Sequence, residues 1–300
     1  MAGETNLVEH VLETLEIENW DDHVTEEQSQ KALHALESGK VIYLPRLDFI
    51  LDKHETRFLD AKWADPKSKN ISFSRTTGKL KGALGNQNDQ ADLALMLARY
   101  SDSGKTLLRK LFPHYGEKLK LARTSFRPAE VSQRILSPRK DDSRLHVDSF
   151  PATPTGGNRI LRVFTNVNPN GQSRKWRLGE PFEKVARRFL PHIPEPSPTL
   201  ARLMITLGVT RGYRTAYDHY MLHLHDHMKA DEAYQCRATQ VPFNFPPYCS
   251  WIVFTDQVSH AAMAGQFAFE QTCHISSSAQ ANPAQTPLGI LEHLLSRKLT

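Results

Sequence analysis

Two neighbouring stretches decide the fold, Arg144-Leu-His146-Val-Asp148-Ser-Phe-Pro151 and Arg159-Ile-Leu-Arg-Val-Phe-Thr-Asn-Val167. The second alternates like a β-strand and is closed by the turn Asn168-Pro-Asn-Gly171. In the first, His146 and Asp148 stand two residues apart. Side chains in extended backbone alternate with a period of two, so both point to the same side and can reach one metal ion.

A later stretch repeats this arrangement and supplies a third ligand. In Val253-Phe-Thr-Asp-Gln-Val-Ser-His260, an apolar strand and a polar turn precede a histidine that begins a new strand. Two imidazoles and one carboxylate on one face bind non-heme Fe(II) and leave positions open for a cosubstrate and oxygen. A His-x-Asp pair alone is a weak signal in a chain with 14 histidines, and the alternative for His260 is a turn histidine bonded to backbone.

Strands on either side of a long helical segment indicate an α+β fold. We expect helices at 26–37 behind the capping residue Thr25, at 92–112 with a break near Ser103-Gly104, across 180–237, and at 287–299. We expect strands at 41–45, 122–126, 159–167, 250–255 and 266–275. Strands in this order suit a single barrel or sandwich with a helical insertion.

Composition excludes several classes of protein. With 300 residues, 39% hydrophobic and 24% charged, the chain is an ordinary globular one, and no apolar run approaches the roughly 18 residues of a membrane span. Three widely spaced cysteines argue against a disulfide framework and favour the reducing cytosol. The net charge of +5 fits an acidic ligand, nucleic acid or an anionic membrane surface, without choosing between them.

Iron with open positions needs a source of electrons. If 2-oxoglutarate supplies them, its 5-carboxylate requires a buried cation, but residues 261–275 contain neither Arg nor Lys. Arg162, between Leu161 and Val163, is the first candidate, in a placement that resembles the asparaginyl-hydroxylase and Jumonji arrangement. Arg159 and Arg127 are the other two candidates, because a guanidinium binds a carboxylate through two hydrogen bonds.

Taken together, the chain resembles the bacterial 3-deoxy-manno-octulosonic acid (Kdo) 3-hydroxylases, which are Fe(II)/2-oxoglutarate dioxygenases. The stretches that carry the likeness run from about residue 60 to 275. They are Lys69-Asn-Ile-Ser-Phe73, Thr124-Ser-Phe-Arg-Pro128, Lys140 to Pro151, Arg159 to Pro169, Leu178-Gly-Glu-Pro-Phe182, Tyr217 to Asp226 and Val253 to His260.

The resemblance implies a double-stranded β-helix core, iron ligands at His146, Asp148 and His260, and hydroxylation at C3 of the terminal Kdo of a lipopolysaccharide precursor. It implies one dioxygenase domain over 1–300: a support region at 1–120, a core at 121–275 with the helical insertion at about 180–237, and a terminal helix at 285–300. The implied location is the cytoplasm, with peripheral contact to the inner membrane. The oligomeric state stays open.

The helical insertion offers sugar-binding candidates and a rival metal site. His219, His223 and His227 are four residues apart, so on a helix they share a face. This face could bind zinc, but the glutamate of an HExxH motif is absent, and contact with the acidic sugar or the core is the favoured interpretation. Trp176, between Lys175 and Arg177, could cover the substrate.

Two further alternatives concern the partner. A dioxygenase of this type could hydroxylate a protein side chain instead of a sugar. A basic module that binds nucleic acid is the non-enzymatic alternative, but no basic–aromatic strand motif or Cys/His finger supports it. An anionic membrane could attract the basic residues Lys105, Arg109, Lys110, Lys118, Lys120 and Arg123, although such a run is more often a solvated face.

Overall fold

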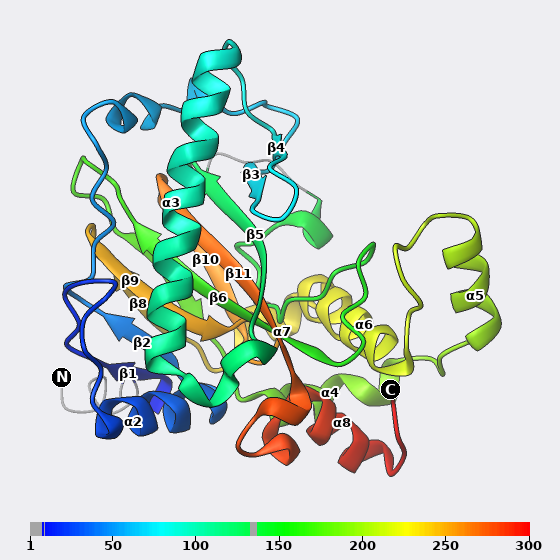
Figure 1. Cartoon of the computed structure of the whole chain (residues 1–300). Coiled ribbons are helices and arrows are strands. Elements are labelled where there is room, and N and C mark those ends of the chain that lie inside the picture. The colour runs from blue at the N-terminus through cyan, green and yellow to red at the C-terminus, as the bar shows by residue number, and fades with distance from the viewer. Residues whose placement is uncertain (1–7, 9, 133–136) are drawn as a thin grey trace.

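The computed structural model describes residues 8, 10–132 and 137–300 and contains two sheets (Figure 1). The larger sheet has the strand order β1-β2-β9-β6-β11-β5-β3-β4, and the smaller has the order β10-β7-β8. Apart from the parallel pair β1–β2, neighbouring strands are antiparallel. The strands are β1 (Leu12–Thr14), β2 (Val41–Leu44), β3 (Ile71–Ser74), β4 (Leu80–Lys81), β5 (Lys120–Arg127), β6 (Asn158–Asn166), β7 (Arg174–Leu178), β8 (Val241–Phe245), β9 (Cys249–Phe254), β10 (His260–Ala264) and β11 (Ala268–Ser276).

Helices cover the outer side of the large sheet and the end of the molecule near the small one. The helix α3 runs across the face of the large sheet, and α5 projects away from both sheets at the right of Figure 1. No helix in the described part of the chain is both long and apolar enough to cross a bilayer. The α-helices are α2 (Glu26–Glu37), α3 (Gln87–Leu111), α4 (Phe182–Phe189), α5 (Pro198–Thr206), α6 (Ala216–Ala230), α7 (Glu232–Arg237) and α8 (Pro287–Leu295).

The central strand β6 separates two environments. Leu161 and Val163 point to the outer face of the sheet and pack in one apolar cluster with Leu36 of α2 and Leu107 of α3. Phe164 points to the inner face, where its ring meets that of Trp176 on β7 at a centroid distance of 5.2 Å. The two sheets therefore face each other, and even-numbered residues of β6 point into the space between them.

The expected α+β class and most expected helices are confirmed. Thr25 caps α2 through a reciprocal capping box with Gln28. The expected break at Ser103-Gly104 is wrong, because α3 continues without interruption to Leu111. Gly104 is buried against the side chain of Gln271 on β11, so packing on the sheet outweighs the low helix propensity of glycine.

The strands β7 and β8 were not expected from the sequence, and neither were β1, β3 and β4. In β7 the residues Arg174, Trp176 and Leu178 are buried and alternate with Lys175 and Arg177. Because three of these five residues are charged, the apolar alternation typical of a strand is weak. Pro242 argues against a strand in β8, but β8 lies at the edge of the small sheet, where an amide hydrogen is dispensable. These two strands complete the wall opposite β6.

Candidate metal centre

The structure brings His146, Asp148 and His260 together between the two sheets. One ligand atom from each lies within 4.8 Å of the others, and His146 Nε2 is 3.6 Å from Asp148 Oδ1. Main-chain hydrogen bonds fix this arrangement: the amides of His146 and His260 each donate to the other residue's carbonyl, at 3.0 and 2.9 Å. The Asp148 amide donates to Thr255 O at 2.7 Å. Ligands that are 114 positions apart in the chain thus share one antiparallel bridge.

Both imidazoles are oriented for metal binding by their second nitrogen. His146 Nδ1 donates to Arg144 O and His260 Nδ1 donates to Val258 O, each at 2.8 Å. A carbonyl oxygen only accepts, so the proton of each neutral ring resides on Nδ1 and leaves Nε2 with a free lone pair. Asp148 Oδ2 is buried without a well-directed hydrogen bond. Two imidazole nitrogens and a carboxylate in a buried site fit non-heme Fe(II).

Burial and neighbouring charges keep the three groups in their metal-binding forms. Burial and the proximity of His260 lower the pKa of His146 to about 3. Burial also lowers the pKa of His260. For Asp148, burial opposes ionisation, but Arg162 and the two imidazoles outweigh it and hold the carboxyl pKa well below its ordinary value. Neutral imidazoles and an ionised carboxylate bind a divalent metal without first losing protons.

Arg162 lies beside the ligands and is held by two carboxylates. Its Nη2 is 3.0 Å from Asp148 Oδ2, and its Nη1 is 3.0 Å from Glu270 Oε1 on the neighbouring strand β11. The third nitrogen, Nε, is buried without a hydrogen-bond partner. Arg127 on β5 forms an ion pair with the other oxygen of Glu270. Two of the three predicted cosubstrate arginines therefore meet at Glu270, next to the metal ligands.

A second group of charges, which the sequence analysis did not single out, continues from Arg127. Asp142 Oδ2 lies 2.5 Å from Lys69 Nζ and 3.7 Å from Arg127 Nη1, and Asp142 Oδ1 lies 3.5 Å from the buried Lys229 Nζ. Burial opposes ionisation of Asp142, but these cations and His146 lower its pKa. Arg127, Arg162, Lys69 and Lys229 face Asp142, Asp148 and Glu270, four cations against three anions.

The third predicted arginine points away from the metal ligands. Arg159 is completely buried on the outer side of β6, where Nε donates to Asp256 Oδ2 at 2.7 Å and Nη2 donates to Gln257 Oε1 at 2.6 Å. Its guanidinium lies 3.7 Å from the centre of the Phe254 ring. The structure thus separates Arg159 from Arg162, although both lie on one strand.

The predicted sugar-binding residues Trp176, His219 and His223 each contact other side chains of the protein. Trp176 is 3% exposed, and its indole stacks on the ring of His260 at 5.1 Å. The rings of His219 and His223 on α6 lie 4.4 Å apart and are tilted by 49°, and His219 Nε2 donates to Pro194 O at 2.7 Å. In the part of the chain that the structure describes, the His146–Asp148–His260 set is the one group of three such side chains close enough to hold an ion. The α6 histidines do not form a second.

His225 and Arg174 were not among the site residues predicted from sequence. His225 of α6 meets the ring of His146 edge-on at 5.5 Å, and its Nδ1 lies 3.0 Å from Asp226 Oδ1. At 100° per residue it lies on the opposite side of α6 from His223. Arg174 precedes Trp176 by two positions and shares its buried face of β7, and Arg174 Nη1 donates to Gly265 O at 2.7 Å. Strand and helix periodicity would have found both, once the element boundaries were known.

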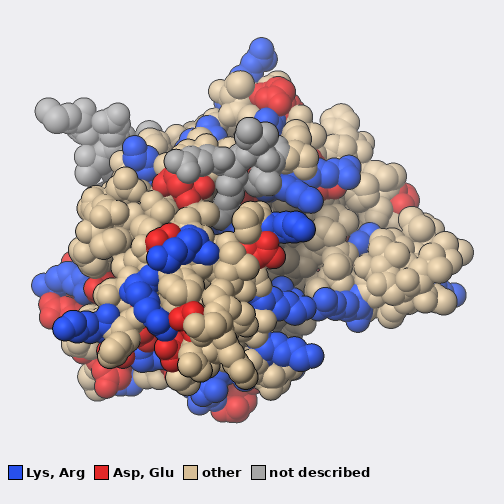
Figure 2. All heavy atoms as spheres, turned by 90° about the horizontal axis from the view of Figure 1, so that it is seen from above, with Lys and Arg blue, Asp and Glu red and all other residues tan. Residues whose placement is uncertain are grey.

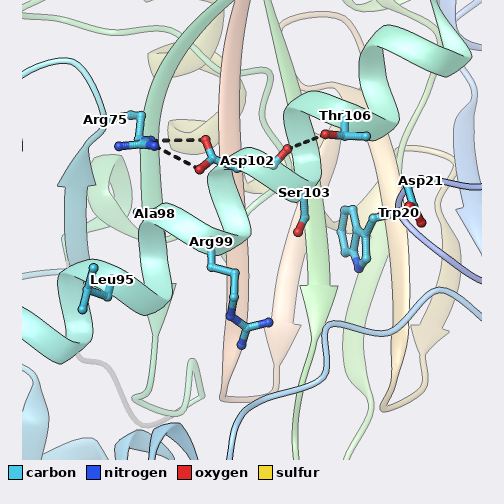
Figure 3. A pocket seen from close by; sticks show the side chains of 9 residues that line it. All are labelled: Trp20, Asp21, Arg75, Leu95, Ala98, Arg99, Asp102, Ser103 and Thr106. Atoms are coloured by element: carbon cyan, nitrogen blue, oxygen red, sulfur yellow. Dashed lines mark hydrogen bonds and ion pairs between the residues drawn. The ribbon is translucent and has the colours of Figure 1, made fainter.

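A surface depression of about 640 Å³ lies elsewhere, on the outer side of α3 (Figure 3). Arg75 spans it with a two-point ion pair to Asp102, at 3.2 and 3.0 Å. Because α3 and the large sheet separate this depression from the metal ligands, it has no part in the candidate centre. Its lining residues are Trp20, Asp21, Arg75, Leu95, Ala98, Arg99, Asp102, Ser103 and Thr106.

Comparisons with known proteins agree with this geometry. Residues 19–298 match the family described as 3-deoxy-D-manno-oct-2-ulosonic acid (Kdo) hydroxylase. None of the curated proteins matches the chain. A crystal structure of the Kdo hydroxylase KdoO, a non-heme Fe(II) α-ketoglutarate-dependent dioxygenase, with α-ketoglutarate and Fe(III), is 47% identical over 97% of both chains, with a TM-score of 0.94.

Two further structures of KdoO are equally similar. The cobalt(II) complex is 48% identical over 96% of this chain and 97% of that one, with a TM-score of 0.94. The complex with succinate and Fe(III) has the same identity and coverage and a TM-score of 0.93. The expected jelly-roll type of core is confirmed by this likeness. The chain therefore belongs to the Kdo hydroxylase family of Fe(II)- and 2-oxoglutarate-dependent dioxygenases.

Proposed function

We propose that this chain hydroxylates C3 of the terminal Kdo sugar of a Kdo-lipid precursor, with Fe(II) held by His146, Asp148 and His260. The observation that carries the proposal is the buried set of two imidazoles with free Nε2 atoms beside one ionised carboxylate. Bound Fe(II) supplies the oxidising chemistry: one oxygen atom of O2 enters the C–H bond, and the other enters succinate as 2-oxoglutarate loses CO2.

Arg162 is the residue that we assign to the 5-carboxylate of 2-oxoglutarate. It is buried, it lies on the inner face of β6 beside Asp148, and its Nε has no partner. Glu270 holds the guanidinium in place, so little side-chain entropy is lost when a carboxylate binds. Arg127 is the second residue of this anion site, because Glu270 links it to Arg162.

The charge around the centre suits an anionic sugar. Four cations against three anions leave a net positive interior, and a carboxylate on the sugar balances it. His225 of α6 adds an imidazole beside His146. These positive and imidazole groups favour an acidic sugar over a neutral protein side chain.

We place the enzyme in the cytoplasm, in peripheral contact with the membrane that carries its glycolipid. Within the basic run, Arg109 pairs with Glu117 and Lys110 donates to Asp21 O, so these two side chains contribute little to such contact. The whole of 1–300 acts as one dioxygenase domain in this proposal, since β1 and β2 from the first part of the chain extend the same sheet as β6.

A turnover assay tests the function. Purified protein with Fe(II), 2-oxoglutarate and O2 is given Kdo-lipid, a Kdo-free lipid or a peptide library, and succinate and product mass are measured. We expect succinate formation coupled to one added oxygen atom on Kdo alone. His146→Ala and Asp148→Ala should abolish both, together with the visible band of the anaerobic Fe(II)–2-oxoglutarate complex. Coupled hydroxylation of peptides without Kdo turnover would overturn the proposal.

A further inference from the structure

An exposed apolar lobe projects from the body beside the candidate centre. We call residues 198–214, which comprise α5 and the loop after it, the α5 lobe. Its exposed fractions reach 67% for Leu207, 55% for Leu200 and 54% for Val209. Of the large apolar side chains that the described part of the chain leaves exposed, six lie here: Leu200, Leu203, Ile205, Leu207, Val209 and Tyr213. Such a concentration on one small element marks an interaction surface.

The charges of the α5 lobe are all positive. Residues 196–214 contain Arg202, Arg211 and Arg214 and no Asp or Glu. In Figure 2 the lobe is the nearly uncharged surface at the right, beyond a recess bordered by Lys and Arg side chains. Apolar side chains with arginines and without acids are the composition of segments that lie in the interface of an anionic bilayer.

The α5 lobe is hydrogen-bonded to the loop that carries two of the three proposed metal ligands, His146 and Asp148. Arg214 Nη2 donates to Pro151 O at 2.7 Å, and the amide of Arg211 donates to Ala152 O at 2.9 Å. Pro151 is three residues after Asp148. The apolar surface and the candidate centre thus have a fixed relation, and a membrane that covered the lobe would pass close to the loop of His146 and Asp148.

We propose that the α5 lobe docks the protein on an anionic phospholipid bilayer, so that the sugar head group of a membrane-anchored glycolipid reaches the metal centre. This inference rests on the proposed function for its substrate. A bilayer explains the lobe better than a second copy of the chain. A symmetric contact would place three arginines against the same three arginines without an acid to pair them.

Vesicle binding tests the docking surface without any Kdo-lipid. The full chain is mixed with vesicles of phosphatidylcholine, with or without phosphatidylglycerol, and the bound fraction is measured by sedimentation. We expect Leu203→Ser/Leu207→Ser to lower the partition coefficient by at least about tenfold, because two half-exposed leucines no longer enter the interface. Ile50→Ser/Leu95→Ser is the matched control, since both residues are more exposed but lie elsewhere.

Charge and activity give independent readouts. Arg202→Gln/Arg211→Gln should lower binding to phosphatidylglycerol vesicles by about fivefold for each arginine and leave binding to phosphatidylcholine unchanged. The leucine variant should keep wild-type turnover of a water-soluble Kdo disaccharide and lose turnover of Kdo-lipid in vesicles. Failure of both substrates in the wild type would refute the function, and vesicle binding would still test the lobe.

Three results would overturn the docking proposal. The first is wild-type protein that does not sediment with anionic vesicles. The second is a leucine variant that sediments as the wild type does. The third is a dimer in solution that the leucine variant converts to monomer, which would assign the lobe to self-association.

Discussion

Arg159 and Arg162 are three positions apart on β6, yet their surroundings are opposite. Arg159 is fully buried on the outer face of the large sheet, where Asp256, Gln257 and Gln280 accept its hydrogen bonds. Arg162 faces the metal ligands, with Asp148 and Glu270 beside it and Nε unpartnered. All three guanidinium nitrogens of Arg159 donate hydrogen bonds to the protein, whereas Nε of Arg162 keeps a hydrogen that a ligand can accept.

Two arginines on one strand can therefore have different surroundings according to whether their positions are odd or even, since this decides which face of the sheet each side chain occupies. An odd separation on a β-strand places two side chains on opposite faces. Asp256, the partner of Arg159, lies in the turn that also supplies Thr255 O to the amide of Asp148. Arg159 therefore supports the loop of the centre from behind, and Arg162 lies beside the proposed metal ligands.

The largest expected effect is a loss of stability when the buried ion pair between Arg159 and Asp256 is broken. Arg159→Met leaves the Asp256 carboxylate buried without its cation, which costs about 3–5 kcal/mol of unfolding free energy. Urea denaturation of the metal-free protein measures it. Arg159→Met/Asp256→Asn should recover a substantial part of the loss, because no unpaired charge remains. A single variant within about 1 kcal/mol of wild type would show that the pair is not what holds this side of β6.

Arg162→Gln should instead weaken the binding of 2-oxoglutarate. Loss of a charge-assisted hydrogen bond to a carboxylate costs about 2–3 kcal/mol, which is a roughly 30- to 150-fold rise in the dissociation constant of 2-oxoglutarate. Anaerobic titration of the Fe(II) protein, followed by the visible band, measures it. Cobalt(II) binding without 2-oxoglutarate serves as the control and should persist, since all three ligands remain. Unchanged 2-oxoglutarate affinity would reassign its carboxylate to another cation.

The smallest expected effect concerns His274, which lies between the two arginines. Its Nδ1 is 3.3 Å from Arg159 O. Burial lowers its pKa from 6.5, and the charge of Arg162 adds to this, although the bond to Arg159 O opposes it. Below 6.5 the unfolded chain binds a proton that the folded chain does not, so this residue makes stability rise with pH.

Replacement of His274 should flatten that dependence. We expect His274→Gln to show a smaller gain in unfolding free energy between about pH 5 and pH 7 than wild type. His293→Gln, at an exposed position in α8, is the control and should follow the wild-type curve. An equal slope for wild type and His274→Gln would mean that the imidazole is solvated in the folded protein.

The grouping of the three proposed metal ligands and the main strands were predictable from sequence because they follow local rules. A period of two aligned His146 with Asp148, and the repeated strand–turn–histidine pattern indicated His260. The capping box of Thr25 gave the start of α2 to the residue. These signals need only neighbours in the chain.

The charged surroundings were not predictable in this way. Glu270, Asp142, Lys69 and Lys229 come from four segments, and only the folded chain shows that they balance Arg127 and Arg162. The continuity of α3 through Gly104 likewise depends on packing against β11. Ion pairs and packing contacts between segments that are distant in the chain produce no periodic pattern in the sequence, so they cannot be predicted from local rules.

The mutual hydrogen bonds between the main chains of His146 and His260 have a kinetic consequence. Their two amide hydrogens are buried in the bridge between the His146 loop and β10, so solvent deuterium can reach them only when this bridge opens. Release of a metal ion from the proposed centre would then follow the same opening event. The hydrogen-exchange rates of the His146 and His260 amides would therefore measure how often this bridge opens.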